Sequence, residues 1–312
     1  MKIRMLAFVL LTGMIFHTNV QAESSGICGE NLLACSYTLS DDGVLKIKGI
    51  GEMTSRPWFL QKETIKNVEI SVGITSIARF AFADIPNLGS ITIPDTVKTI
   101  GWGAFQNDEK LAMVSFGQFS NLSKIENFAF SGSGLQGFMP YLPTTVSKIG
   151  QGAFERVPAK TISIPSNLKT IRTGTFLNAE LQCIAIPGSV KKVQGQAFAG
   201  CKSVNCMAMA ENVEMVSALA FDGVAPSELI ISSDQIQIYL DARGSLKNIS
   251  KLYCSDGADA CKAVLTELGY GDLNSKVYSS VYTQKALKYA TDKTKQDFCG
   301  WLPPCKIESL AK

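Results

Sequence analysis

The sequence predicts a mainly β solenoid, a fold in which short coils of chain stack along one axis. The first observation is a phenylalanine that returns every 22 to 25 residues, in six of seven cases directly after an alanine. Repeats of this length cannot bury an apolar face alone, so neighbouring coils must stack to make a core. The second observation is a recurring pair of apolar residues separated by one residue, which is the period of a half-buried strand. The repeated phenylalanines are Phe82, Phe105, Phe130, Phe154, Phe176, Phe198 and Phe221.

The repeat between Leu88 and Phe105 shows how each coil is expected to fold. Ile91 and Ile93 alternate with polar residues and predict a strand, which Pro94 ends because proline has no N–H to donate to a ladder. A second, shorter extended segment and a glycine-containing turn follow, and the Ala-Phe pair then enters the core. We therefore expect the seven rings to form one continuous spine. Equivalent strand pairs are Ile162/Ile164, Ile184/Ile186, Met207/Met209 and Leu229/Ile231.

Residues 1–22 have the features of a secretory signal peptide. Lys2 and Arg4 precede an apolar run over residues 5–16, and Val20-Gln21-Ala22 resembles a cleavage site. The run is too short to indicate a membrane span, and we expect no transmembrane segment after cleavage. We therefore expect an exported protein, in the periplasm, on the cell surface or outside the cell. The predicted parts are the signal peptide (1–22), an N-terminal β cap (23–66), a solenoid of about seven to eight coils (67–240) and a C-terminal cap or small module (241–312).

The composition of the chain after the leader excludes several classes of function. It holds 28 basic and 27 acidic residues, a balance that gives no electrostatic reason to bind nucleic acid. The only histidine, His17, lies in the leader, which excludes Ser-His-Asp and Cys-His catalysis and zinc sites that need histidine. We expect no cofactor, no metal and no enzymatic activity. A hydrolase that uses paired carboxylates is the one acid–base alternative.

All nine cysteines follow the leader, where disulfides persist, and their odd number leaves at least one thiol outside any internal pair. Cys28 and Cys35 predict a local disulfide in the cap. Cys183 and Cys206 occupy the outward position of adjacent strands, about 4.8 Å apart, and predict a disulfide between coils. Cys201 stands at an inward position and is predicted to be the buried odd thiol. The same position, three residues after the repeated phenylalanine, holds Ile85, Val157, Ala179 and Val224 in other coils.

The last seventy residues are predicted to form a small, partly helical region stapled by disulfides. Helical spacing is found over residues 259–268 and 280–295. This region is either a cap that covers the open edge of the core or a separate module. Its four cysteines, Cys254, Cys261, Cys299 and Cys305, allow three pairings, and a Cys₄ zinc site is the alternative, although their spacing lacks the usual short turns.

The residues that alternate with the buried strand positions predict an outward face that is small, neutral and mildly apolar. Such a face suits a flat partner, a protein or a glycan, and it is equally compatible with an ordinary solvated sheet. Two coils carry insertions, near residues 118–120 and 138–143, and insertions in repeat proteins map to one face. The candidate binding-face residues are Ser90, Thr92, Met113, Ser115, Met139, Thr161, Ser163, Ala185, Ala208 and Glu228.

The repeats and the N-terminal segment resemble one known family. The pattern L-x-x-I-x-I-P-x-x-V-x-x-I-G-x-x-A-F-x-x-C is matched by residues 88–105, 162–176 and 190–201, and the family's N-terminal segment is matched by Cys28-Gly29-x-Asn31-Leu32 and Trp58. Over residues 26 to about 240 the chain is similar to the bacterial BspA-like, or Treponema pallidum type, leucine-rich repeats. It departs from the family at residues 33–37, where a tryptophan is usual, and in its cysteine-containing C-terminal region.

This resemblance implies a right-handed leucine-rich repeat solenoid at the cell surface or secreted, with a role in adhesion or protein binding. It carries no catalytic residues over to this chain. The leading interpretation is therefore an exported, non-enzymatic binding protein that recognises a protein or glycan through its strand face. The alternative is a structural, self-associating protein of the cell envelope, and a carboxylate-dependent hydrolase is the remote one.

Overall fold

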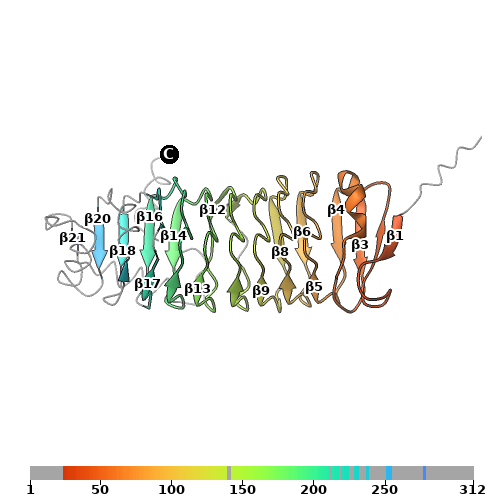
Figure 1. Ribbon diagram of the computed structural model, residues 1–312, viewed down its shortest axis with the longest axis horizontal. Helices are drawn as coiled ribbons and strands as arrows, with labels where there is room; N and C mark the ends of the chain where they lie inside the picture. The colour runs from red at the N-terminus through yellow and green to blue at the C-terminus, as the bar shows by residue number, and fades with distance from the viewer. Residues whose placement is uncertain are drawn as a thin grey trace, which may run out of the picture.

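The computed structural model describes residues 24–224, apart from 139–141, 211 and 218, and beyond them only four strands. The described chain is an elongated stack of coils, with strands running across its long axis and the N-terminal cap at one end (Figure 1). The predicted signal peptide and the predicted C-terminal helices lie outside the described residues. The four later strands are β18 (Glu228–Ile231), β19 (Gln237–Ile238), β20 (Lys251–Cys254) and β21 (Val277–Tyr278).

The N-terminal cap begins with three antiparallel strands, β1 (Ser24–Ile27), β2 (Ser36–Leu39) and β3 (Val44–Lys48). The direction changes at β4 (Asn67–Ile70), which pairs with β3 in parallel. Between β3 and β4 lies a 3₁₀ helix, η1 (Pro57–Thr64), the one helix in the described part of the chain. Its Trp58 is buried and donates a hydrogen bond from Nε1 to the carbonyl of Ala81 at 2.8 Å, which ties the cap to the first coil.

Each coil contributes one strand to a longer-strand side of the stack and one two-residue strand to the other side, and the strands of each side pair in parallel ladders that are interrupted between some neighbouring coils (Figure 1). The ladders run from coil to coil because successive repeats have nearly the same length and so present equivalent residues side by side. The strands of the longer-strand side have four residues, except that β10 has two and β12 has three: β6 (Ser90–Ile93), β8 (Met113–Phe116), β10 (Gly137–Phe138), β12 (Ala159–Thr161), β14 (Cys183–Ile186), β16 (Cys206–Met209), β18 and β20. The two-residue strands are β5 (Ser76–Ile77), β7 (Thr99–Ile100), β9 (Lys124–Ile125), β11 (Lys148–Ile149), β13 (Thr170–Ile171), β15 (Lys192–Val193), β17 (Met215–Val216) and β19.

The Ala-Phe turn closes each coil and also bonds to the next one. The N–H of Phe130, for example, donates to the carbonyl of Ala153 at 2.8 Å, and the same bond recurs along the stack. Thr175 occupies the alanine position in one coil, fully buried, and its hydroxyl donates to the carbonyl of Arg172 at 2.8 Å. The residue before the phenylalanine must therefore be small or must satisfy its own polar group, since it lies between coils.

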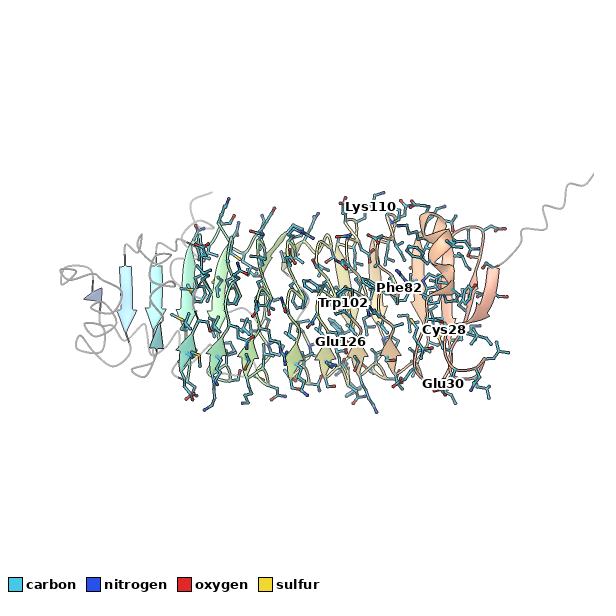
Figure 2. The ribbon with its side chains drawn as sticks, viewed as in Figure 1. Cys28, Glu30, Phe82, Trp102, Lys110 and Glu126 are labelled. Atoms are coloured by element: carbon cyan, nitrogen blue, oxygen red, sulfur yellow. A yellow bond between two sulfur atoms is a disulfide. The ribbon has the colours of Figure 1, made fainter. Side chains whose placement is uncertain are left out.

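The seven phenylalanine rings form the continuous spine that the sequence predicts. Neighbouring centroids are 5.0 to 5.7 Å apart, the ring planes are within 3° to 25° of parallel, and every ring is buried. Trp58 continues the stack at the cap end, 5.8 Å from Phe82, and Tyr37 meets Trp58 edge to face at 5.4 Å. One apolar column thus runs from the cap through the coils, and Figure 2 shows Phe82 near its N-terminal end.

The coil that holds β12 differs from the predicted pattern. The strand ends at Thr161, before Ile162 and Ile164, which were expected to lie within it; both side chains are nevertheless buried. The register between β10 and β12 shifts after Gly137. Gly137 lies opposite Ala159 and Phe138 opposite Thr161, so Lys160 is an extra residue on the β12 side, as in a β-bulge.

The strand ladder also continues past residue 240, the expected end of the solenoid. β20 pairs with β18 in parallel, with Leu252 opposite Leu229, and β21 pairs with β20. The alternation of Leu252 and Cys254 matches that of Leu229 and Ile231 one coil earlier. Strand pairing therefore persists after the recognisable Ala-Phe signal has ended.

Candidate functional site

The longer strands place the candidate binding-face residues on the outward side of one ladder. The pairing is in register, with Ser90 opposite Met113 and Thr92 opposite Ser115. Outward residues therefore form short rows across β6 and β8 and again across β14 and β16, where Ala185 is opposite Ala208, whereas Ser163 lies just after the end of β12. The exposed members are Ser90, Thr92, Met113 and Ser163, and the half-buried ones are Ser115, Thr161 and Ala185.

The face does not remain accessible over its whole predicted length. Ala208 in β16 is only 3% exposed, and Cys183, another outward-alternating residue in the preceding strand β14, is 2% exposed. Strand alternation fixes the direction of a side chain but not its accessibility. The Met139 and Glu228 side chains lie outside the described residues. The accessible candidate face is thus the part formed by the earlier coils.

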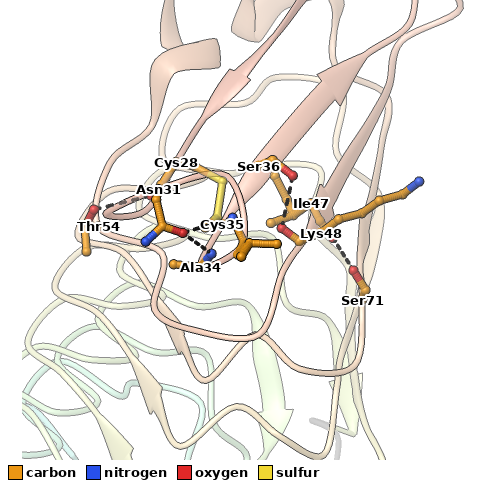
Figure 3. The surroundings of a disulfide bond; sticks show 10 residues. Cys28, Asn31, Ala34, Cys35, Ser36, Ile47, Lys48, Thr54 and Ser71 are labelled. Atoms are coloured by element: carbon orange, nitrogen blue, oxygen red, sulfur yellow. Dashed lines mark hydrogen bonds between the residues drawn. A yellow bond between two sulfur atoms is a disulfide. The ribbon is translucent and has the colours of Figure 1, made fainter.

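The predicted Cys28–Cys35 disulfide is present, with Cα atoms 5.0 Å apart and both residues buried. It closes the loop between β1 and β2 (Figure 3). The side-chain oxygen of Asn31 accepts hydrogen bonds from the N–H groups of Leu33 and Ala34, both at 3.0 Å. The covalent bond and these two hydrogen bonds fix the loop at the N-terminal end of the core, which is a structural role.

The cysteines of the middle coils follow the register that the sequence predicts. Cys183 in β14 lies directly opposite Cys206 in β16, so the proposed disulfide between coils joins residues that are strand partners. Cys201 points inward and is a buried thiol, and its Sγ donates to the carbonyl of Phe176 at 3.1 Å. Burial raises the pKa of the Cys201 thiol to about 12. A thiol of this kind is unreactive because the thiolate is the nucleophilic form.

Alkylation of the folded protein is expected to leave Cys201 unmodified, whereas alkylation in guanidinium chloride should label it, because unfolding removes the burial that suppresses the thiolate. Peptide mapping without reduction measures which cysteines are alkylated. The same map is expected to contain a Cys183–Cys206 cross-linked peptide. Recovery of a Cys201–Cys206 peptide would contradict both assignments.

One buried residue was missed by the sequence reasoning. Asp108 occupies the inward position held by Ile85 one coil earlier and by Cys201 further along, and it is fully buried. Its Oδ1 accepts a hydrogen bond from the N–H of Ile85 at 2.8 Å, whereas Oδ2 has no hydrogen-bond partner among the described residues. Burial raises the pKa of Asp108 to about 8. Comparison of this position between coils shows Asp108 as the one acid, beside Ser133 and five apolar or thiol residues.

Asp108 is not placed to act on a dissolved substrate, because none of its surface is exposed. With its raised pKa, Asp108 is protonated inside the core at pH 7. Its role in the structure is to accept the hydrogen bond from the N–H of Ile85 in the preceding coil. In the part of the chain that the structure describes, no three His, Cys, Asp or Glu side chains are grouped to hold a metal. Within the same residues, no helix has the length and apolar character needed to cross a membrane.

These observations define a β solenoid built from parallel, phenylalanine-centred repeats. The family model for the BspA type leucine rich repeat region matches in six copies, over residues 53–139 and 139–249. The chain belongs to this family, which confirms the resemblance inferred from its motifs. No curated protein matches the chain.

Solved bacterial structures are similar to this chain. A leucine-rich repeat protein from Bacteroides ovatus is 16% identical, with 77% of this chain and 71% of that chain covered and a TM-score of 0.56. One from Eubacterium ventriosum is 21% identical, with coverage of 76% and 80% and a TM-score of 0.45. The leucine-rich repeat protein of T. pallidum is 18% identical, with coverage of 75% and 92% and a TM-score of 0.34. The likeness to the Bacteroides ovatus protein supports the fold alone.

Proposed function

We propose that this protein is an exported, non-enzymatic binding protein that recognises a protein or a glycan through the accessible part of its strand face. Membership of the BspA type leucine-rich repeat family supports a binding or recognition role. The signal-peptide features of residues 1–22 support export. The observation that carries the proposal is the in-register outward face of β6 and β8, where neutral side chains lie opposite one another.

The chemistry of this face suits a flat and extended partner. Ser90, Thr92 and Ser163 are exposed and small, so a partner can approach the sheet closely and bond to hydroxyl groups that both donate and accept. Met113 is 54% exposed and adds a flexible apolar contact. Equivalent positions recur about every 4.8 Å from coil to coil, which favours a partner that can contact several coils in succession.

A variant with arginine at two exposed positions, Thr92→Arg with Ser163→Arg, is expected to lose most of the binding seen with the unaltered chain. The long charged side chains would hold a flat partner off the sheet. The matched control, Thr99→Arg with Thr170→Arg, introduces the same charges on the two-residue strands β7 and β13. Pull-downs from extracellular matrix, mucin and envelope fractions measure the difference. Equal capture by both variants and the unaltered chain would show that this face is not the binding surface.

A further inference from the structure

A second surface lies where the two-residue strands end and the Ala-Phe turns begin, away from the longer strands. Six side chains from η1 and the first three coils form a row there, which we call the cation–aromatic row: Arg56, Phe59, Arg79, Phe80, Trp102 and Phe128. Arg79 is exposed, Phe59 is 37% exposed, and the other four are half-buried. The row therefore combines large rings with two guanidinium groups at the molecular surface.

Cations and rings alternate along the row. The guanidinium carbon of Arg56 lies 4.2 Å from the ring centre of Phe59 and 5.2 Å from that of Phe80. The Arg79 carbon lies 5.2 Å from the Phe80 centre and 4.4 Å from that of Trp102. These distances are within the range of cation–π attraction, so each arginine is held in place by the rings beside it.

Trp102 is fixed between two phenylalanines from the neighbouring coils. It meets Phe80 edge to face at 4.5 Å and Phe128 edge to face at 5.7 Å. Its backbone N–H donates to the Glu126 carboxylate of the next coil at 3.1 Å, and Figure 2 shows these two residues near each other in the middle of the N-terminal half. The exposed part of the indole is thus held rigidly before any partner arrives.

The backbone beneath the row is unusual for bulky side chains. Phe80 and Phe128 have φ angles of 54° and 57°, in the left-handed region that favours glycine, and several coils do have glycine at this position. A Cβ on Gly103 would lie 2.6 Å from the Phe80 ring, and one on Gly152 would lie 2.4 Å from the Phe128 ring. Each ring therefore lies over the glycine of the next coil. Gln196 and Leu219 adopt the same backbone conformation at the equivalent position of later coils, so the row is distinguished by its aromatic rings and not by the φ angle.

The charges of the row define the kind of partner that it fits. Among the described residues, neither Arg56 nor Arg79 forms an ion pair, whereas Glu126 is already paired with Lys124 at 2.6 Å. The carboxylate of Asp84 is the charged group that attracts the Arg56 guanidinium electrostatically. Its Oδ1 also accepts a hydrogen bond from Asn107. Burial lowers the pKa of Arg56, which indicates that its guanidinium has already lost part of its hydration.

The side chains of the row donate hydrogen bonds but accept none. Arginine and tryptophan are donors only, and phenylalanine is neither donor nor acceptor. Sugar hydroxyls both donate and accept, so the row would satisfy only their accepting side, whereas carboxylates only accept and are matched in full. Tryptophan and arginine are also the residues that concentrate binding energy at protein interfaces. The row is therefore suited to a protein segment that carries carboxylates next to aromatic or aliphatic side chains.

We infer that the cation–aromatic row is a second binding surface, and that it takes an acidic protein segment with aromatic side chains. Carboxylates of the partner contact Arg79 and Arg56, and its rings pack on Trp102 and Phe128. The surface adds to the proposed strand face and does not depend on it, since the two share no residue.

Biolayer interferometry with the full, oxidised chain tests this inference. The probes are a random copolymer of glutamate and tyrosine, polyglutamate of the same length, and heparin. The copolymer is expected to bind most tightly, and Arg79→Gln is expected to weaken it by at least about tenfold, as loss of a charge-assisted contact does. Arg172→Gln, which removes an exposed arginine beyond the row, should leave the affinity within about twofold. Equal thermal melting of the two variants checks that both are folded.

Three results would overturn the inference: no binding of the copolymer, equal binding by Arg79→Gln and Arg172→Gln, or tighter, Arg79-dependent binding of heparin. The last result would assign the row to anionic glycans instead. None of these results affects the strand-face proposal, because that proposal is tested with Thr92 and Ser163 variants and with different partners.

Discussion

Replacement of Phe154 by alanine is expected to lower the free energy of unfolding by about 3–5 kcal/mol. Phe154 lies in the middle of the spine, fully buried, 5.4 Å from Phe130 and 5.7 Å from Phe176. The truncation removes apolar contacts with both neighbouring coils and leaves a cavity that a stack of hydrogen-bonded coils cannot easily collapse. Because each repeat is stabilised mainly by its neighbours, the loss affects two coil interfaces at once.

Guanidinium denaturation followed by far-UV circular dichroism measures the effect of Phe154→Ala. The matched control is Phe119→Ala, which removes a ring that is 76% exposed and should change the stability by less than about 0.5 kcal/mol. A free energy of unfolding that is the same for Phe154→Ala and the unaltered chain would be incompatible with a spine that stabilises the fold.

The spine and its register could be predicted because one physical requirement repeats. Each coil must bury a large ring next to a small residue, so Phe and Ala recur at the coil period and mark every other position by their distance from it. This register correctly predicted that Cys201 points inward and that Cys183 lies opposite Cys206. The same register assigns Thr175 to the alanine position, where its hydroxyl donates a hydrogen bond to a carbonyl of its own turn.

The register could not predict which outward residues are accessible. Cys183 and Ala208 have the alternation of surface residues and are buried, because accessibility depends on what lies above a side chain and not only on its direction. The end of β12 and the persistence of the ladder into β20 were missed for a related reason. Strand pairing depends on the backbone of the neighbouring coil, and it can shift or continue where the side-chain pattern changes.

The cation–aromatic row was missed because its signal is an exception to the repeat rather than the repeat itself. Phe80 and Phe128 stand two residues before the spine phenylalanine, a position that other coils fill with Gly103, Gly152, Gly174, Gln196 and Leu219, so the exception is the aromatic ring. Bulky residues at a position that favours glycine are visible in an alignment of the coils. The contact of Phe80 with Arg56, the residue before η1, however, depends on how the cap packs on the first coil and is available only from the structure.

Asp108→Asn is expected to make the protein more stable at pH 8 and to leave it nearly unchanged at pH 4. The folded-state pKa of Asp108 is raised by burial to about 8, whereas an unfolded aspartate has a pKa of about 3.9. Below pH 4 both states hold the proton, and stability is fully present. Between pH 4 and 8 the unfolded state releases its proton while the folded state keeps it, so Asp108 makes stability fall as pH rises, and the loss is complete above the folded pKa. Asparagine keeps an oxygen for the N–H of Ile85 and does not titrate.

The expected gain at pH 8 is about 2–5 kcal/mol, since a difference of roughly four pKa units between the two states sets the upper end of this range. Urea denaturation at pH 4, 6 and 8 measures it, and the advantage of Asp108→Asn should grow at each step. The control, Asp222→Asn, makes the same chemical change at an exposed aspartate and should keep the pH dependence of the unaltered chain. Parallel pH profiles for Asp108→Asn and Asp222→Asn would mean that Asp108 is hydrated enough to ionise normally, and that its place in the apolar column does not limit stability.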